Sequence, residues 1–301
     1  MNNLTIKQLR YFEAVANQQH FGRAAQVCNI SQPAISVQIK ELEESLGQTL
    51  FERRARQVCL TSFGEQFAIR VRPILRAVDD LSDLARASHE GLVGKLRLGV
   101  IPTIGPYLLP RIVAQMNTAY PQVDLHIRET QTHNLISDLL GGTLDLALVA
   151  LPISEPELTE LPLFEERFVL LRSASDAGKP VPDGSALSKM KLLLLEEGHC
   201  FRDQALSFCR MPSNGPKESM EGSSLSTLVQ MVASGLGVTL IPQMAVALEA
   251  RSTDVDVARF AKPEPTRTIG LVWRKASPMS ARFEKIGNLV NTSMDQIPIK
   301  N

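Results

Sequence analysis

The residues best suited to covalent chemistry are two cysteines, Cys200 and Cys209, which lie nine positions apart. A cysteine reacts as its thiolate, and the N-terminus of a helix lowers the pKa of a thiol placed there. Cys200 follows Glu196-Glu197-Gly198-His199, where the pattern predicts that a helix begins. The sequence therefore favours Cys200 as the more reactive of the two thiols.

The spacing of these cysteines makes a bond between them conditional on a change of structure. On one continuous helix, nine residues give ~13.5 Å of rise and ~900° of rotation, which places the thiols on opposite faces. A disulfide needs Cα atoms within roughly 7 Å of each other. Oxidation that joined the two thiols would have to unwind part of this segment, and neighbouring surfaces would change with it.

Two other interpretations of the cysteines stay open on the residues alone. A free cysteine is most often a small buried apolar residue, and this is the interpretation we prefer for Cys28 and Cys59. Together with His199, Cys200 and Cys209 also offer three metal ligands. Their spacing does not resemble a zinc-binding pattern, so neither a metal nor another cofactor is expected.

Six further side chains are candidates for binding a small polar ligand beside the thiol. The two threonines each follow a predicted strand, and in α/β sheets the carboxyl ends of strands face the ligand crevice. The histidine is suited to donate a hydrogen bond or a proton, and the arginines would add positive charge. The aspartate is close in sequence and is expected to help orient the site. These residues are Thr103, Thr132, His199, Arg202, Asp203 and Arg267.

Residues 1–61 are predicted to form a winged helix-turn-helix. Apolar residues recur at helical spacing after Thr5-x-x-Gln8, a capping-box pattern, and a second short helix is predicted over Phe21–Cys28. Ser31 is a predicted N-cap with Pro33 in the first turn, and Gly47 closes this third helix. Leu50–Arg53 and Val58–Thr61 are expected to pair as the wing, which carries Arg53, Arg54 and Arg56.

A helix-turn-helix with a polar outer face predicts binding to double-stranded promoter DNA. The first turn of a recognition helix reaches base edges, where glutamine and serine can hydrogen-bond and proline can touch a thymine methyl. Arginines outside that turn are better placed for phosphate, which gives affinity without sequence information. The candidate DNA-binding residues are Arg23, Ser31, Gln32, Pro33, Ser36, Gln38, Arg53 and Arg54.

Residues 62–90 are predicted to form one long helix that makes a dimer. Ser62-x-x-Glu65 is a capping pattern at its start. A heptad-like apolar seam follows, and no second core is evident nearby in the sequence to cover it. The seam consists of Phe63, Phe67, Val71, Ile74, Val78, Leu81 and Leu84. A dimer implies a pseudo-palindromic site with half-sites in successive major grooves.

Residues 91–301 are predicted to form an α/β domain. Predicted strands, such as Lys95–Ile101 and Ile269–Arg274, alternate with helices, which favours a parallel sheet with crossover helices. The length suits two Rossmann-like subdomains with a cleft between them. The first spans about 91–165 plus 269–301, and the second about 166–268. The fold class is therefore α+β multidomain, with a body similar to periplasmic binding proteins.

Several blocks of sequence, in order, resemble LysR-type transcriptional regulators. At the DNA-binding end these are Phe21–Ala25, Ser31–Ser36, Leu42-Glu43, Leu46-Gly47, Leu50–Arg53 and Leu60-Thr61-x-x-Gly64. In the body, Gly198–Cys209 is similar to the redox segment of the hydrogen-peroxide-sensing members of that family. Ile101–Pro110, Gln131–His133 and Pro265–Val272 are similar to them as well. The resemblance covers the whole chain.

The resemblance implies a role for each thiol. Cys200 would be the peroxidatic cysteine, oxidised first to sulfenic acid, and Cys209 would resolve it as a disulfide. It also implies control of oxidative-stress genes, a dimer of dimers on DNA, contact with RNA polymerase, and re-reduction by a glutaredoxin or thioredoxin system. The peroxide is then the signal, and the chain is expected not to be an enzyme.

The charge and the apolar content of the chain limit which classes of protein it can belong to. Lys plus Arg and Asp plus Glu both number 32, so the net charge is zero, which excludes a strongly basic nucleic-acid coat protein. Residues 1–72 nevertheless hold nine basic and six acidic side chains, which permits DNA binding. No apolar run is long enough to span a membrane, and the first ten residues carry charges where a signal peptide would be apolar. A cytoplasmic protein is expected.

Three rival functions remain on the sequence. The nearest is a LysR-type regulator that senses a small metabolite in the cleft between the subdomains, with the thiols incidental. A cytosolic thiol peroxidase is disfavoured by the predicted DNA-reading domain. A solute-binding protein would have a similar body, but it would need a signal peptide.

Overall fold

The computed structural model describes residues 4–54, 57–87, 92–212, 220–251 and 253–295 of the 301. Two compact units divide the chain between Leu84 and Ala85. The first unit contains three helices, α1 (Ile6–Gln18), α2 (Phe21–Val27) and α3 (Gln32–Leu46). The antiparallel pair β1 (Phe51–Arg54) and β2 (Gln57–Leu60) follows, then α4 (Ser62–Ala87). This is the predicted winged helix-turn-helix followed by a long helix.

Local signals account for the helix ends of this unit. The Thr5 hydroxyl accepts a hydrogen bond from the Gln8 backbone N–H, and the Gln8 side-chain oxygen accepts one from the Thr5 backbone N–H, as the capping box predicts. Ser31 caps α3 through the Ala34 N–H, and Gly47 ends it in the left-handed conformation. The prediction that Ser62 caps α4 is wrong. Thr61 takes this role, because its hydroxyl accepts from the Gly64 N–H while it donates to the Thr49 carbonyl.

Part of the apolar seam of α4 is buried in its own unit and part is exposed to solvent. This corrects the prediction of one continuous dimer seam. Of the predicted seam, Val71 is 2% exposed and belongs to the core of the helix-turn-helix. Leu75, which the predicted seam does not include, is 3% exposed in the same core. The rings of Phe67 and Phe12 meet edge to face at 5.0 Å. This half of the helix therefore finds its partner within its own unit, a contact that periodicity within α4 does not reveal.

The second unit is built around a seven-stranded mixed sheet, in the order β10-β6-β11-β5-β3-β4, with β9 also paired to β6. Its remaining strands, β7 and β8, form a separate parallel pair. The elements are β3 (Gly94–Val100), α5 (Gly105–Ala119), β4 (Val123–Glu129), α6 (Thr132–Gly141), β5 (Leu146–Leu151), β6 (Leu158–Ser173), η1 (Ala174–Asp176), α7 (Gly184–Leu187), β7 (Leu193–Leu195), α8 (Cys200–Phe208), β8 (Met220–Gly222), α9 (Leu225–Ala233), β9 (Thr239–Pro242), η2 (Gln243–Ala245), α10 (Val246–Glu249), β10 (Val255–Arg259), β11 (Thr266–Arg274) and α11 (Ser280–Asp295).

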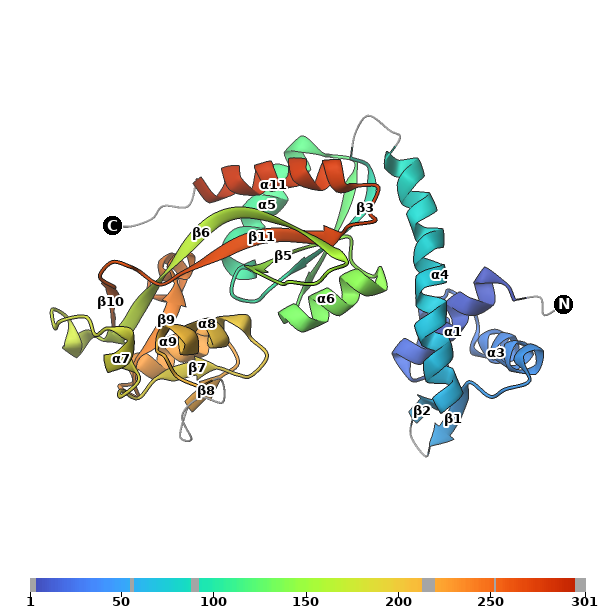
Figure 1. Cartoon of the computed structure of the whole chain (residues 1–301), viewed down its shortest axis with the longest axis horizontal. Helices are drawn as coiled ribbons and strands as arrows, with labels where there is room; N and C mark the ends of the chain where they lie inside the picture. The colour runs from blue at the N-terminus through green and yellow to red at the C-terminus, as the bar shows by residue number, and fades with distance from the viewer. Residues whose placement is uncertain (1–3, 55–56, 88–91, 213–219, 252, 296–301) are drawn as a thin grey trace. The chain divides into compact units, whose positions relative to one another are not determined.

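The predicted fold class is confirmed, but the prediction of a wholly parallel sheet is wrong. Strand β3 is parallel to β4 and β5, whereas β11 is antiparallel to both β5 and β6. The reason is that β6 follows β5 after a short connection without a crossover helix, and β11 then inserts between them. The two long strands β6 and β11 run together through the middle of this unit (Figure 1).

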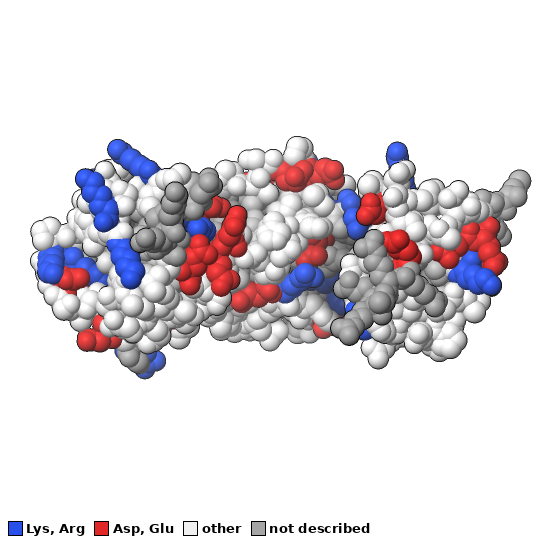
Figure 2. Space-filling view, turned by 90° about the horizontal axis from the view of Figure 1, so that it is seen from below, with Lys and Arg blue, Asp and Glu red and all other residues white. Residues whose placement is uncertain are grey.

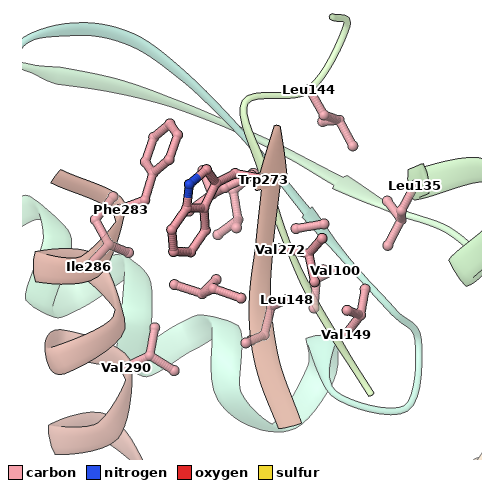
Figure 3. Close-up of a cluster of buried hydrophobic side chains, with 14 of the residues drawn as sticks. Val100, Leu135, Leu144, Leu148, Val149, Val272, Trp273, Phe283, Ile286 and Val290 are labelled. Carbon is pink, nitrogen blue, oxygen red and sulfur yellow. The ribbon is translucent and has the colours of Figure 1, made fainter. Parts of the chain in front are cut away.

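Two hydrophobic cores lie along these strands. In the first core, α5 and α11 pack on one face of the sheet and α6 packs on the opposite face, as Figure 1 shows. In Figure 3, Trp273 faces Phe283 and Ile286 of α11, while Leu135 of α6 lies on the opposite side of the strands. The other core gathers α8, α9 and the second half of β6. A site between the two cores is therefore built from both.

Candidate functional site

Cys200 is the first residue of α8 and lies beside a pocket of about 420 Å³. The chain enters the helix through Gly198, whose φ of +93° is a conformation that other residues rarely adopt. A Cβ at this position would stand 2.7 Å from the side-chain oxygen of Gln131, so the space also requires glycine. The pocket is lined by Thr132, Ala150, Leu151, Pro152, Ile153, Cys200, Gln204, Thr266, Arg267 and Thr268.

The two thiols belong to different cores. Cys200 is half-buried and packs against the first core, whereas Cys209 is completely buried in the second. Cys209 caps the C-terminus of α8, so the whole segment from Cys200 is helical, as expected, and about 13.5 Å of helix rise separates the two positions. Burial raises the pKa of the Cys209 thiol to about 11. The arrangement leaves Cys200 as the accessible thiol, and it does not suit a shared metal ion.

Two buried polar atoms without a hydrogen-bond partner lie on residues of this pocket. They are the hydroxyl oxygen of Thr132 and the side-chain oxygen of Gln204. A buried polar atom that loses its bonds to water costs free energy unless another partner replaces them. The pocket therefore offers hydrogen-bonding groups for a small polar ligand next to the Cys200 thiol.

Arg267 and Thr103 form the polar floor behind this pocket. The Arg267 guanidinium donates to the Thr103 hydroxyl at 2.8 Å and to the Thr103 carbonyl at 3.1 Å. It also pairs with the Glu166 carboxylate at 2.6 Å and lies 5.3 Å from the centre of the Phe201 ring. Of the predicted ligand-binding residues, Thr132 and Arg267 thus share the pocket lining with Cys200, and Thr103 lies behind it, bonded to Arg267.

The other three predicted ligand-binding residues are placed differently. His199 precedes Cys200 and is 8% exposed, and this burial lowers the pKa of its imidazole although Glu196 opposes the shift. His199 is therefore neutral at neutral pH. Arg202 turns away from the pocket, because it donates to the Leu195 carbonyl at 2.9 Å and pairs with Glu221 at 2.7 Å. Asp203 is exposed to solvent, and none of these three residues contributes to the lining.

Sequence reasoning missed Gln204, Thr266 and Thr268. Gln204 lies four residues after Cys200 and so shares its face of α8, a signal that helical spacing alone provides. The two threonines stand at the start of β11, which the sequence places only from Ile269 onward. Their position depends on the pairing of β11 with β6, which no local pattern indicates.

The outer face of α3 carries most of the predicted DNA-reading residues. Gln32 and Pro33 are exposed in its first turn, next to the capping residue Ser31, and Ser36 is half-buried one turn later. Val37 was not predicted, yet it is 53% exposed at the middle of this face. An apolar side chain there is suited to contact a thymine methyl.

The remaining predicted DNA-binding residues have other local partners or stand on the wing. Gln38 donates to Glu41 at 2.7 Å, and Arg23 donates to the Gln18 carbonyl at 2.7 Å. Arg53 and Arg54 lie on β1 of the wing, and Arg56 lies outside the described residues. Figure 2 shows that the face it presents carries both basic and acidic side chains.

A winged helix-turn-helix together with an α/β body that holds a polar pocket defines a signal-responsive DNA-binding regulator. Two family profiles match the chain, the bacterial regulatory helix-turn-helix of the lysR family over residues 6–65 and the LysR substrate binding domain over residues 89–295. The protein belongs to the LysR family of transcriptional regulators. Within the described residues, no helix has the length and apolar character needed to cross a membrane.

Two bacterial relatives match the chain over nearly its full length. A probable hydrogen peroxide-inducible genes activator of Streptomyces viridosporus is 44% identical over 300 residues, covering 98% of this chain and 96% of the relative. The DNA-binding transcriptional dual regulator OxyR of Escherichia coli K12 is 39% identical over 294 residues, covering 97% and 96%.

Solved structures agree with these relatives. A full-length Pseudomonas aeruginosa OxyR with one cysteine replaced by aspartate superposes with a TM-score of 0.77 at 39% identity, covering 96% of this chain and 95% of that one. A cysteine-to-serine OxyR mutant of Corynebacterium glutamicum, bound to hydrogen peroxide, gives 0.68 at 35% identity and covers 97% and 93%. The chain is an OxyR-like LysR regulator.

Proposed function

We propose that this regulator responds to hydrogen peroxide through oxidation of Cys200 and a Cys200–Cys209 disulfide. The Cys200 thiolate attacks one peroxide oxygen, the O–O bond breaks, and sulfenic acid and hydroxide form. The Cys209 thiol then attacks the sulfenic sulfur, and the S–S bond forms as water leaves. The main support is the pair of unpartnered polar atoms, on Thr132 and Gln204, in the pocket beside an accessible thiol.

The pocket residues have distinct parts in this reaction. Peroxide is a small donor and acceptor of hydrogen bonds, so the Thr132 hydroxyl and the Gln204 amide are suited to hold it in line with the thiol. Negative charge develops on the leaving oxygen, which favours hydrogen-bond donors around it. Arg267 lines the pocket and holds the Thr103 hydroxyl behind it. No cofactor takes part. A glutaredoxin or thioredoxin system would supply the thiols that restore the reduced form.

The regulator would act in the cytoplasm as a homotetramer on promoter DNA, where it contacts RNA polymerase and controls oxidative-stress genes. Two chains would pair through α4, and two such dimers would associate. The exposed apolar side chains of α4 support the first contact, since Phe63, Ile74, Leu81 and Leu84 are 36%, 46%, 68% and 59% exposed.

The test of the proposed function is stoichiometric peroxide added to the reduced protein. We expect two thiols to be lost per chain, a Cys200–Cys209 linked peptide in mass spectrometry, and a changed footprint on promoter DNA. A pocket of about 420 Å³ is also large enough for a metabolite. If the thiols stay free while a metabolite changes the footprint, the metabolite-sensing function is the correct one.

The DNA interface predicts two different effects of substitution. Gln32→Ala should relax sequence preference by about 1–3 kcal/mol of discrimination, because a base contact is lost. Arg53→Ala should weaken binding to all sequences and flatten its salt dependence, because a phosphate contact is lost. Competition gel shifts at several salt concentrations measure both effects. If Arg53→Ala changed the preferred sequence and kept the salt slope, this division of contacts would be wrong.

The dimer contact predicts that Leu81→Glu halves the mass of the assembly. A charge there would meet the partner helix in an apolar contact, where burying it is costly. Ile69→Glu is the matched control, because Ile69 is 64% exposed but lies about 120° around the helix from Leu81. Light scattering that shows the same mass for both variants would place the interface elsewhere. Val71 is unsuitable for this test, since its substitution would disrupt the core of its own unit.

A further inference from the structure

Arg267 and Glu166 form an ion pair buried directly behind the Cys200 pocket. Their side chains are 1% and 2% exposed, and two guanidinium nitrogens of Arg267 lie 2.8 Å and 2.6 Å from the same Glu166 oxygen. The other Glu166 oxygen accepts from the Met244 N–H at 3.2 Å. Both oxygens of this carboxylate are therefore engaged inside the protein, and Arg267 is the partner that balances its charge.

The ion pair with Glu166 changes the electrostatic effect of Arg267 on the Cys200 thiol. An unbalanced guanidinium beside a cysteine favours the thiolate and lowers the pKa of the thiol. Here the Glu166 carboxylate lies 2.6 Å from the guanidinium, which also donates hydrogen bonds to the hydroxyl and the carbonyl of Thr103. The positive charge of Arg267 and the negative charge of Glu166 therefore largely cancel in their effect on the pocket. Arg267 therefore holds Thr103 in place behind the site and brings little net positive charge to the thiol.

We propose that Glu166 limits the reactivity of the Cys200 thiol by cancelling the charge of Arg267, and so sets how much peroxide is needed to oxidise it. Glu166 acts through Arg267 and not on the substrate, which makes it a positioning residue. Burial raises the pKa of the Glu166 carboxyl, and the Arg267 guanidinium at 2.6 Å acts in the opposite direction. The inference rests on the proposed function only in taking Cys200 as the thiol that peroxide oxidises.

The test measures thiol ionisation without peroxide or DNA. In full-length protein with Cys28, Cys59 and Cys209 changed to serine, Cys200 is the remaining thiol. Its rate of alkylation by iodoacetamide, a neutral reagent, is followed from pH 5 to 10. Glu166→Gln keeps the shape of the side chain and removes its charge. We expect the midpoint of the pH profile to fall by about one unit, the lower end of the effect of a nearby opposite charge.

Glu166→Gln leaves Arg267 buried without its counter-charge, which can prevent folding. A second variant keeps the proposal testable in that case. The double variant Glu166→Gln, Arg267→Gln removes both charges. If they cancel at Cys200, its midpoint should match that of the parent protein within about 0.3 units. Circular dichroism establishes that each variant is folded.

Two outcomes would overturn the proposal. One is an unchanged or raised midpoint in folded Glu166→Gln, and the other is a clearly raised midpoint in the double variant, which would mean that Arg267 acts on Cys200 despite its partner. A peroxide arm separates this inference from the proposed function. If Glu166→Gln lowers the alkylation midpoint while peroxide leaves Cys200 unmodified, the inference stands and the proposed function fails.

Discussion

Cys200→Ser should abolish the response to peroxide, whereas Cys209→Ser should still react once. A serine hydroxyl is not ionised near neutral pH and forms no sulfenic acid, so the first variant has no site of attack. In the second variant Cys200 is intact, but the thiol that would release water from the sulfenic acid is gone. Mass spectrometry after one equivalent of peroxide should show an unmodified peptide in the first variant. In the second it should show Cys200 sulfenic acid, or its over-oxidised forms.

The difference in burial between the two thiols means that Cys200 is oxidised first and Cys209 reacts second. The Cys209 side chain is fully buried, and this burial raises the pKa of its thiol to about 11, which disfavours the reactive thiolate. Cys200 lies at a pocket with unpartnered polar atoms and is open to a small reagent. Cys28→Ser is the matched control, since Cys28 is a free thiol in the other unit, and it should keep the full response. A sulfenic acid found first at Cys209 would contradict this order.

The sequence predicted those parts of the site that depend on neighbours along the chain. The capped start of α3 at Ser31 and the helix from Cys200 to Cys209 follow from local hydrogen bonding and helical spacing. It also predicted that Thr103 and Thr132 follow strands, and they come after β3 and β4, which are parallel, although only Thr132 lines the pocket itself. These are features that side-chain type and periodicity determine directly.

The sequence could not show where charged side chains find partners far away in the chain. Arg202 and Arg267 are alike as residues, yet Arg202 pairs with Glu221 while Arg267 pairs with Glu166, 101 positions away. The pairing of Arg267 requires β6 and β11 to lie side by side in a mixed sheet, which their patterns do not indicate. For the same reason the division of the α4 seam required the packing of the helix-turn-helix to be known.

The packing of α8 should oppose disulfide formation, and weakening it should make the disulfide harder to reduce. Leu206 is 1% exposed and Phe201 is 3% exposed in the second core, and the Phe201 ring meets Phe168 edge to face at 4.8 Å. These contacts hold Cys209 in the core and keep it about 13.5 Å of helix rise from Cys200, beyond the reach of a disulfide. Joining the thiols requires some of these contacts to break.

Leu206→Ala therefore should favour the oxidised form. A buried Leu→Ala change costs about 2–5 kcal/mol in a packed structure, and here most of that cost falls on the reduced, helical form. For a two-electron couple this corresponds to a reduction potential more negative by roughly 40 to 110 mV. Equilibration with glutathione buffers of known ratio, read by thiol labelling, measures the shift.

Leu228→Ala is the matched control for this prediction. Leu228 is 1% exposed in the same core but lies on α9, so its removal weakens the core without acting directly on the helix that must unwind. Its potential should stay close to that of the parent protein. Hydrogen exchange should agree, with residues 200–212 losing protection on oxidation of the parent protein. Equal potentials for Leu206→Ala and the parent would mean that α8 keeps its packing in the disulfide form, and that the thiols are joined by another movement.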